Sequence, residues 1–205
     1  MACRRCFAAT VVLSAALPAC GPGLASLHSL AQAGDVQRDA PRHARQDVVI
    51  NAPVHRVWQC LANVAAWPTW NAAVRSSEAP SSVTGDAMFR WDNHGSDIHA
   101  QLGLVRPDHM LAWSDAVSTA KAIHVWRLSE VSHDVTRVEV EETMDGFLVS
   151  TFYSGYELDH TLATWLFSLK SVAERAEEAL RRRALAPVDG ATRSTVDTRA
   201  VSACQ

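Results

Sequence analysis

Two titratable residues in neighbouring predicted strands, His124 and Glu142, have the clearest capacity for chemistry in this chain. Segments 121–131 and 136–145 are strand-like, and a tight turn at 132–135 joins them, so we expect a hairpin. The expected register pairs apolar side chains across it: Trp126 with Val140 and Leu128 with Val138. The same register places His124 opposite Glu142, with both side chains on the apolar face of the sheet.

A histidine and a carboxylate at cross-strand distance on an apolar face can play three roles. A lone carboxylate there would be costly to bury, and His124 supplies Glu142 with a partner, either as an imidazolium or as a neutral imidazole that donates a proton. The pair has suitable chemistry for general acid/base catalysis of a cyclisation or hydration. It also suits a polar anchor in an apolar pocket. The alternative is a structural pair near the cavity rim that fixes the sheet register.

Aromatic and apolar residues are expected to form the walls around this pair. The chain has seven tryptophans and only two tyrosines. Core packing is the simpler role for buried indoles, but several of them could also line a cavity. The candidate ligand-binding residues are Trp91, Trp113, Trp126, Val140, Met144 and Trp165. Tyr153 and Tyr156 precede the last helix and are expected near the cavity mouth.

Other chemistries lack the residue patterns that they need. His94, Asp97 and His99 resemble metal ligands, but the alternation of their strand separates them or places them on its wet face, so we expect no metal site. The sequence has no Gly-x-Ser-x-Gly elbow, phosphate-binding loop or His-Glu-x-x-His helix, and we expect no cofactor. A formal net charge of −3 gives no electrostatic reason to expect nucleic-acid binding.

The elements that position these residues begin with a strand that runs directly into a pair of short helices. An apolar run at 48–50 precedes Pro53, which suits a first helical position. Apolar residues then recur on one helix face: Val54, Val57, Trp58 and Leu61. Further strands are expected at 74–78, 86–93, 96–105, 109–116, 121–131 and 136–145. A long helix follows, with apolar residues at helical spacing from Leu158 to Leu180.

The strand at 96–105 alternates, with Ile98, Ala100, Leu102 and Leu104 expected on one buried face. A sheet with an apolar face must bury it against another layer, and the last helix is the only expected element long enough to do so. We therefore predict an α+β fold in which a curved antiparallel sheet wraps around the C-terminal helix. Such an arrangement leaves space for a cavity between sheet and helix.

Several motifs resemble the START-like superfamily, also called SRPBCC, polyketide cyclase/dehydrase-like or helix-grip proteins. They are Ile50-x-Ala52-Pro53, Val57-Trp58, Trp67-Pro68, Trp70-Asn71, Pro107-Asp108-His109, Ala122-Ile-His-Val-Trp-Arg127 and Glu142-Thr-Met-Asp-Gly-Phe147. The resemblance covers roughly residues 46–183. It implies the helix-grip fold and a cavity that binds apolar ligands. It does not imply one function, because the superfamily includes lipid carriers, cyclases and hydrolases.

The first residues resemble a bacterial export signal. Arg4 and Arg5 precede an apolar run at 7–19, which is too short to cross a bilayer core of about 30 Å as a helix. Cys20 follows small residues, as in a lipoprotein box, so lipidation of Cys20 and ordinary cleavage further on are both open. We predict a signal peptide at 1–20, a linker at 21–45, the START-like domain at 46–183 and a disordered tail at 184–205. A misassigned start would make the protein cytoplasmic.

The five cysteines, at positions 3, 6, 20, 60 and 204, do not form a recognisable disulfide framework or zinc motif. Cys60 is expected to pack as a small apolar residue.

Three functions are consistent with the sequence. The first is an envelope-located carrier or sensor for a lipid, quinone or polyketide-like aromatic, membrane-attached if Cys20 is lipidated. The second is a cyclase/aromatase-type enzyme with His124 and Glu142 as proton handlers. The third is an interaction domain whose pocket is filled. The oligomeric state is not predicted.

Overall fold

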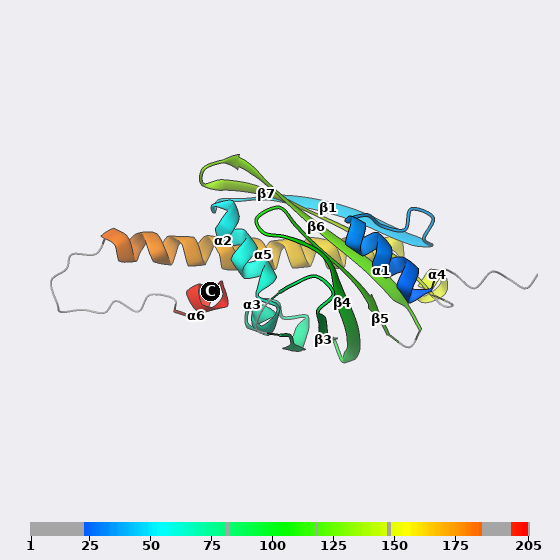
Figure 1. The fold of residues 1–205 in the computed structure, drawn as a ribbon. Coiled ribbons are helices and arrows are strands. Elements are labelled where there is room, and N and C mark those ends of the chain that lie inside the picture. The colour runs from blue at the N-terminus through cyan, green and yellow to red at the C-terminus, as the bar shows by residue number, and fades with distance from the viewer. Residues whose placement is uncertain (1–22, 81–82, 118, 147–148, 186–197, 205) are drawn as a thin grey trace, which may run out of the picture.

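The computed structural model describes residues 23–80, 83–117, 119–146, 149–185 and 198–204, and its centre is an antiparallel sheet (Figure 1). Within these residues the sheet has seven strands, in the order β1-β7-β6-β5-β4-β3-β2. Their bounds are β1 Arg42–Ile50, β2 Val74–Glu78, β3 Met88–Asn93, β4 Ser96–Arg106, β5 Met110–Ala116, β6 Lys121–Ser132 and β7 Val135–Asp145. Consecutive strands from β2 to β7 pair as neighbours, and β1 closes the order beside β7.

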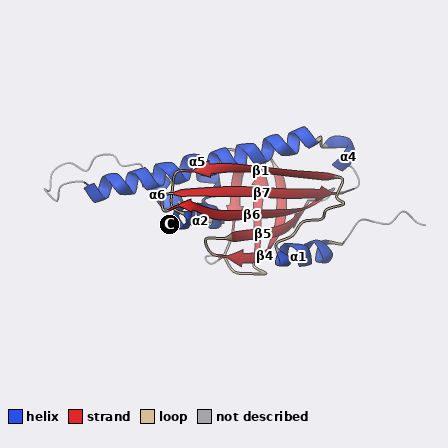
Figure 2. Cartoon of the chain, turned by 90° about the horizontal axis from the view of Figure 1, so that it is seen from above, coloured by secondary structure: helices blue, strands red, loops and turns tan. Residues whose placement is uncertain are grey.

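The long helix α5 (Gly155–Leu185) packs against the sheet, and its axis runs along β1 (Figure 2). Helix α2 (Val54–Ala62), the 3-10 helix η1 (Val64–Ala66) and α3 (Trp67–Trp70) follow β1 directly. Pro53 is the N-cap residue of α2, with an extended ψ of 149°, so it lies one position before the first helical position that was predicted for it. The remaining helices are α1 (Leu24–Ala33), α4 (Val149–Phe152) and α6 (Thr198–Ala203). This arrangement confirms the predicted α+β helix-grip fold.

The sheet buries apolar side chains on both faces. Because successive residues of a strand point to opposite faces, Trp113 and Trp126 face α5 while Ala112 and Val125 face the other side. The larger core lies between the sheet and α2, α3, α5 and α6. A smaller core lies between the sheet and α1, which contacts β4, β5 and β6.

Helix α1 occupies part of the segment expected to be a linker at 21–45, and β1 begins at Arg42 in the same segment. Leu27 and Ala31 of α1 are buried, and Gly34 ends the helix with φ 70°, a conformation that glycine adopts readily. The apolar spacing and the glycine are visible in the sequence, but one short helix gives only a weak periodic signal. The linker prediction was wrong for this part of the chain.

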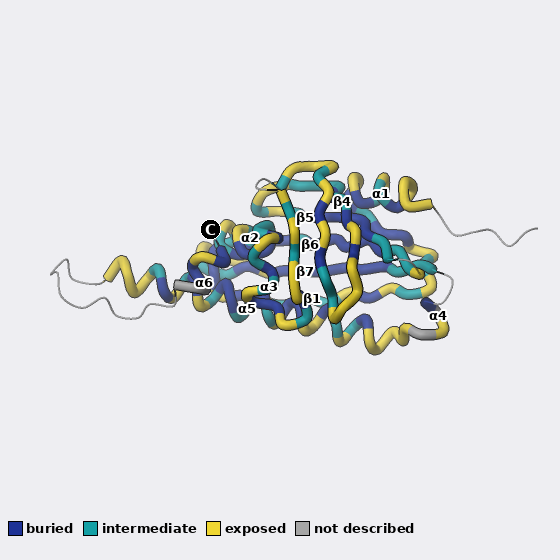
Figure 3. Tube along the Cα trace, turned by 90° about the horizontal axis from the view of Figure 1, so that it is seen from below, coloured by how far each residue is buried: buried dark blue, intermediate teal, exposed yellow. Residues whose placement is uncertain are grey.

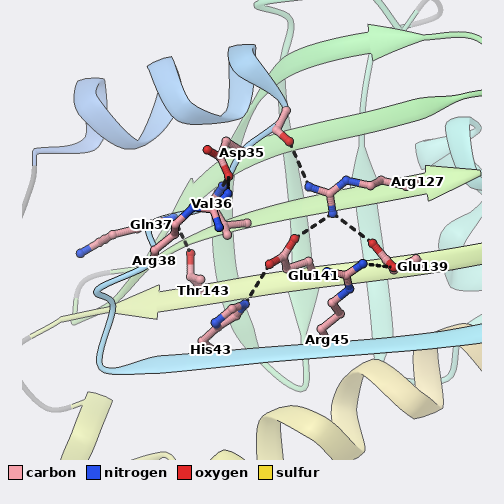
Figure 4. Close-up of polar contacts among 11 residues, drawn as sticks. Asp35, Val36, Gln37, Arg38, His43, Arg45, Arg127, Glu139, Glu141 and Thr143 are labelled. Carbon is pink, nitrogen blue, oxygen red and sulfur yellow. Dashed lines mark hydrogen bonds and ion pairs between the residues drawn. The ribbon is translucent and has the colours of Figure 1, made fainter.

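Polar contacts attach the end of α1 to the outer face of the sheet (Figure 4). Arg127 donates to the carbonyl of Gly34 at 3.1 Å and also pairs with Glu141 at 2.8 Å and Glu139 at 3.3 Å. The backbone N–H of Gln37 donates to the hydroxyl of Thr143. These contacts fix the path of the chain from α1 into β1, so α1 is part of the folded domain.

A register shift in β4 makes room for α1. The pairing of β4 with β5 is regular up to Leu102 and resumes at Val105, so Leu104 packs with the α1 core rather than with Leu102 as predicted. A Cβ atom on Gly103 would lie 2.5 Å from the carbonyl carbon of Ala31. Gly103 therefore permits the close approach of α1 to the strand.

The C-terminal segment differs from the expected disordered tail at 184–205. Cys204 is fully buried and forms a disulfide with Cys60 of α2, so Cys60 is not the free packing cysteine that was predicted. Helix α6 contacts α5 and α3, and the side chain of Asn63 donates to the carbonyl of Ala203. Spacing cannot reveal a bridge between cysteines 144 positions apart. Residues 186–197 lie outside the described residues.

Exposed residues gather on the outer side of α1 and at the projecting end of α5, where residues 181–185 are all exposed (Figure 3).

The predicted signal peptide at 1–20, with Cys20, lies outside the described residues. Among the residues that are described, no helix is both long enough and apolar enough to cross a membrane.

Candidate functional site: a buried acid–histidine–acid group at a cavity

The hairpin of β6 and β7 has the predicted register. His124 lies opposite Glu142, Trp126 opposite Val140 and Leu128 opposite Val138. The short turn between the strands and the alternation of apolar residues leave one register that buries them together. His124 and Glu142 therefore lie side by side on the face of the sheet toward α5.

The structure adds Asp115, a third member that the sequence analysis missed. His124 Nδ1 lies 3.1 Å from Glu142 Oε2, and His124 Nε2 lies 3.0 Å from Asp115 Oδ2. All three side chains are buried. Asp115 is two residues beyond Trp113, which lies opposite His124, so it is a diagonal neighbour on the same face. The alternation of Leu111, Trp113 and Asp115 in the sequence indicates that Asp115 lies on the same face of the strand as Trp113.

Trp113 holds the histidine in place. Its ring stacks on the imidazole with centroids 4.7 Å apart and planes inclined by 16°. Its Nε1–H donates to Oδ2 of Asp115 at 3.2 Å. The aspartate oxygen thus receives two donors, and the orientation of the His124 ring is fixed by a stack and by a hydrogen bond at each nitrogen.

The electrostatics of the group favour a charged His124. Burial alone would lower the pKa of His124, but the negative charges of Glu142 and Asp115, together with hydrogen bonds to both, outweigh burial and raise it to about 10. At neutral pH the ring is therefore an imidazolium between two carboxyl groups.

A cavity of about 380 Å³ lies between the sheet and α5, and the acid–histidine–acid group forms part of its wall. Pockets for small ligands usually fall in the range of about 300–1,000 Å³. Five of the six residues predicted to bind ligand line it: Trp91, Trp113, Trp126, Met144 and Trp165. Val140 does not. It is fully buried in the half of the hairpin that packs tightly, while the cavity lies toward the end of β7 that carries Glu142 and Met144.

Four indole rings, Trp91, Trp113, Trp126 and Trp165, form a tryptophan wall of the cavity, and a fifth, Trp67, packs against them. Trp67 contacts Trp91, Trp113 and Trp165 with centroid distances of 5.1–5.9 Å. Trp126 contacts Trp113 and Trp165. Trp67 does not line the cavity, but its Nε1–H donates to the carbonyl of Leu61 and ties the wall to α2. The Trp67-Pro-Thr-Trp70 segment therefore supports the site from behind.

The sequence model of the family described as "Polyketide cyclase / dehydrase and lipid transport" matches residues 41–182. The chain belongs to this family. The match spans more than half of the chain and includes every residue of the acid–histidine–acid group.

Solved structures place this polyketide cyclase/dehydrase-family chain in the same fold group. A hypothetical protein of Helicobacter pylori is 14% identical with a TM-score of 0.60, over 66% of this chain and 90% of the other. The Zhui aromatase/cyclase from Streptomyces sp. R1128 is 18% identical with a TM-score of 0.53, over 65% and 94%. A START superfamily protein from Mycobacterium smegmatis is 14% identical with a TM-score of 0.53, over 67% and 98%. At such identities these similarities establish the fold alone. No curated protein matches the chain.

The rim of the cavity in this family member includes one of the two predicted tyrosines. Tyr153 lines the cavity, and burial, followed by the charges of Glu142 and Glu157, raises its pKa. Tyr156 is 79% exposed and is not a lining residue.

The residues that resembled metal ligands do not converge. Asp97 pairs with Arg90 and His99 on the exposed side of β3 and β4, and His94 lies in the turn between these strands with φ 51°. Within the described ranges, no group of three or more histidine, cysteine, aspartate or glutamate side chains could hold a metal ion. The acid–histidine–acid group is no exception, because His124 directs each ring nitrogen to a different carboxylate.

Proposed function

We propose that this protein binds a hydrophobic small molecule, such as a lipid, quinone or polyketide-like aromatic, in the cavity between the sheet and α5. The observation that carries the proposal is the cavity itself, whose lining combines four tryptophans and other apolar residues with the buried acid–histidine–acid group. Membership of a family associated with polyketide cyclisation and lipid transport supports the same class of ligand. A carrier or sensor is the role that we favour.

A cyclase/aromatase-type enzyme is the second candidate, and the aromatase/cyclase among the structural neighbours is the observation in its favour. The acid–histidine–acid group could move protons in such a reaction. However, an efficient general base has a pKa near the working pH, and a His124 pKa of about 10 leaves the ring protonated. This property favours a binding role. A third candidate, an interaction domain with a filled pocket, is disfavoured by a cavity of about 380 Å³.

We also propose that the protein works in an oxidising compartment of the cell envelope. Disulfides form and persist mainly in such compartments, and the Cys60–Cys204 bridge supports the proposed export signal. Membrane attachment through a lipid on Cys20 is part of this proposal. Mass spectrometry of the mature N-terminus from native cells tests it: a diacylglyceryl group on Cys20 supports attachment, and an unmodified Cys20 or cleavage beyond it contradicts attachment.

The binding proposal is tested by native mass spectrometry of the full chain, expressed where the disulfide can form, followed by organic extraction. We expect a co-purified apolar molecule. Ala122→Phe should abolish retention, because Ala122 lines the cavity and the added ring would occupy it. Ala163→Phe is the matched control, since Ala163 is exposed on the outer side of α5. A protein that co-purifies with no ligand and also fails to bind apolar fluorescent probes would contradict the proposal.

Turnover distinguishes the enzyme from the carrier. If the extracted molecule is converted by the wild-type protein, and if His124→Gln and Glu142→Gln still bind it but do not convert it, the enzyme candidate replaces the carrier. Unchanged ligand after incubation with the wild-type protein supports the carrier.

A further inference from the structure

The acid–histidine–acid group offers a ligand hydrogen-bond acceptors rather than donors. We infer that the cavity selects apolar molecules that carry a donor, a hydroxyl or an ammonium group, over apolar molecules that carry a carboxylate. This inference rests on the proposed function, because it requires that a ligand enters the cavity. It goes further by naming the polar group that such a ligand carries.

The first step is that His124 has no nitrogen left for a ligand. An imidazole has two ring nitrogens, and here Nδ1 is bound to Glu142 at 3.1 Å and Nε2 to Asp115 at 3.0 Å. Both nitrogens are occupied in either protonation state, because an imidazolium donates two hydrogen bonds and a neutral ring donates one and accepts one. The stack on Trp113 also prevents the ring from turning freely toward the cavity.

The second step is that each carboxyl group keeps one oxygen for a ligand. His124 and the indole N–H of Trp113 both use Oδ2 of Asp115, and His124 uses Oε2 of Glu142. Among the described residues, neither Oδ1 of Asp115 nor Oε1 of Glu142 has a hydrogen-bond partner. Both residues line the cavity. An ionised carboxylate only accepts hydrogen bonds, so the complementary ligand group is a donor.

The third step concerns charge. One imidazolium and two carboxylates sum to one negative charge in a buried place, and the raised pKa of His124 supports this count. A ligand carboxylate would bring a third anion to the group, and burying an unpaired charge is strongly unfavourable. A hydroxyl adds no charge. An ammonium group compensates the charge.

The indole N–H groups of Trp91 and Trp126 do not compete with this preference. Trp91 and Trp126 line the cavity with ring atoms, because their Nε1 atoms are buried away from its surface. Lys121, at the start of β6, is the lining residue to which a carboxylate would be drawn. Lys121 already has an interaction partner. A carboxylate that bound there would show an affinity that depends on Lys121, which makes the two sites separable.

The test measures affinities of the full-length, disulfide-bonded protein at pH 7.5 for four probes that share one aromatic body. Isothermal titration calorimetry is used with naphthalene, 2-naphthol, 2-naphthylmethylammonium and 2-naphthoate. Naphthalene reports on the cavity alone. We expect 2-naphthol and the ammonium probe to bind at least about tenfold more tightly than naphthalene, since hydrogen bonds to charged groups contribute about that factor or more. We expect 2-naphthoate to bind most weakly.

Two variants assign the preference to the buried group. Glu142→Gln replaces an acceptor oxygen by an amide donor and removes one charge, so the preference for 2-naphthol over 2-naphthoate should shrink by about tenfold. Asp97→Asn is the matched control, because Asp97 is an exposed aspartate outside the cavity, and it should leave all four affinities unchanged. Lys121→Met should not raise the affinity for 2-naphthoate. Far-ultraviolet circular dichroism establishes that each variant is folded, and the wild-type ranking stands as a test even if Glu142→Gln does not fold.

The outcomes separate this inference from the proposed function. Donor probes that bind best support both. Equal affinity for naphthalene and 2-naphthol, or tightest binding of 2-naphthoate, overturns the donor preference and leaves the cavity proposal standing. Binding of 2-naphthoate that is lost in Lys121→Met and exceeds that of 2-naphthol also overturns the inference. Failure of every probe to bind overturns the inference together with the cavity as a binding site for aromatic molecules.

Discussion

The charged state of His124 should make the stability of the protein fall as pH rises above neutrality. Its pKa is about 10 in the folded protein and 6.5 for an ordinary histidine. Between these values the folded state holds one proton that the unfolded state has lost. The contribution of His124 to the free energy of unfolding is therefore fully present below pH 6.5 and is lost as the pH rises to about 10. The slope for one proton is about 1.4 kcal/mol per pH unit, which gives a loss of about 2–3 kcal/mol between pH 7 and pH 9.

The assay is urea unfolding of the full-length protein at several pH values from 6 to 9.5, followed by tryptophan fluorescence. The control is the triple variant Asp115→Asn/His124→Gln/Glu142→Gln, in which neutral amides of similar size replace all three charges. The raised pKa of Tyr153 keeps that phenol outside this window. We expect the difference between wild type and variant to fall by about 2–3 kcal/mol from pH 7 to pH 9. Parallel curves for the two proteins would refute the assignment of a buried imidazolium.

Three further perturbations test the frame around the site. Breaking the disulfide with Cys60→Ser or Cys204→Ser should lower the free energy of unfolding by up to about 5 kcal/mol, because the bridge closes a loop between residues 144 positions apart. A change below about 1 kcal/mol in urea titrations would contradict a bridge in the folded protein. Gly103→Ala should speed proteolysis within α1, because the new methyl group would meet the α1 backbone, whereas Gly23→Ala, with open space around it, should not. Trp67→Ala should lower the free energy of unfolding by about 3–5 kcal/mol, measured by thermal or urea unfolding, because this fully buried ring packs against the tryptophan wall. A change near zero would show that the other tryptophans pack equally well without Trp67.

The sequence was sufficient for the fold because its strongest signals are local. The hairpin register follows from a short turn and from alternating apolar residues, and it correctly placed His124 beside Glu142. The long periodic helix at the C-terminus left little choice for what covers the sheet. Both features depend on residues close together in the chain.

The parts that the sequence did not reveal depend on contacts between distant segments. Asp115 is the exception, because the alternation of Leu111, Trp113 and Asp115 directs its side chain toward α5, and the pairing of β5 with β6 then brings it to His124. Val140 shares a face with Glu142, but the curvature of the sheet decides where α5 closes onto the strands and where a cavity remains. The Cys60–Cys204 bridge joins residues that no short-range pattern connects.

The most direct test of the binding proposal is a crystal structure of the full chain with 2-naphthol. The inferred donor preference places the hydroxyl within hydrogen-bond distance of Asp115 or Glu142, whereas the binding proposal itself predicts only that the aromatic rings lie in the cavity between the sheet and α5. A cavity filled by protein side chains, or 2-naphthol bound elsewhere at every concentration tried, would contradict it.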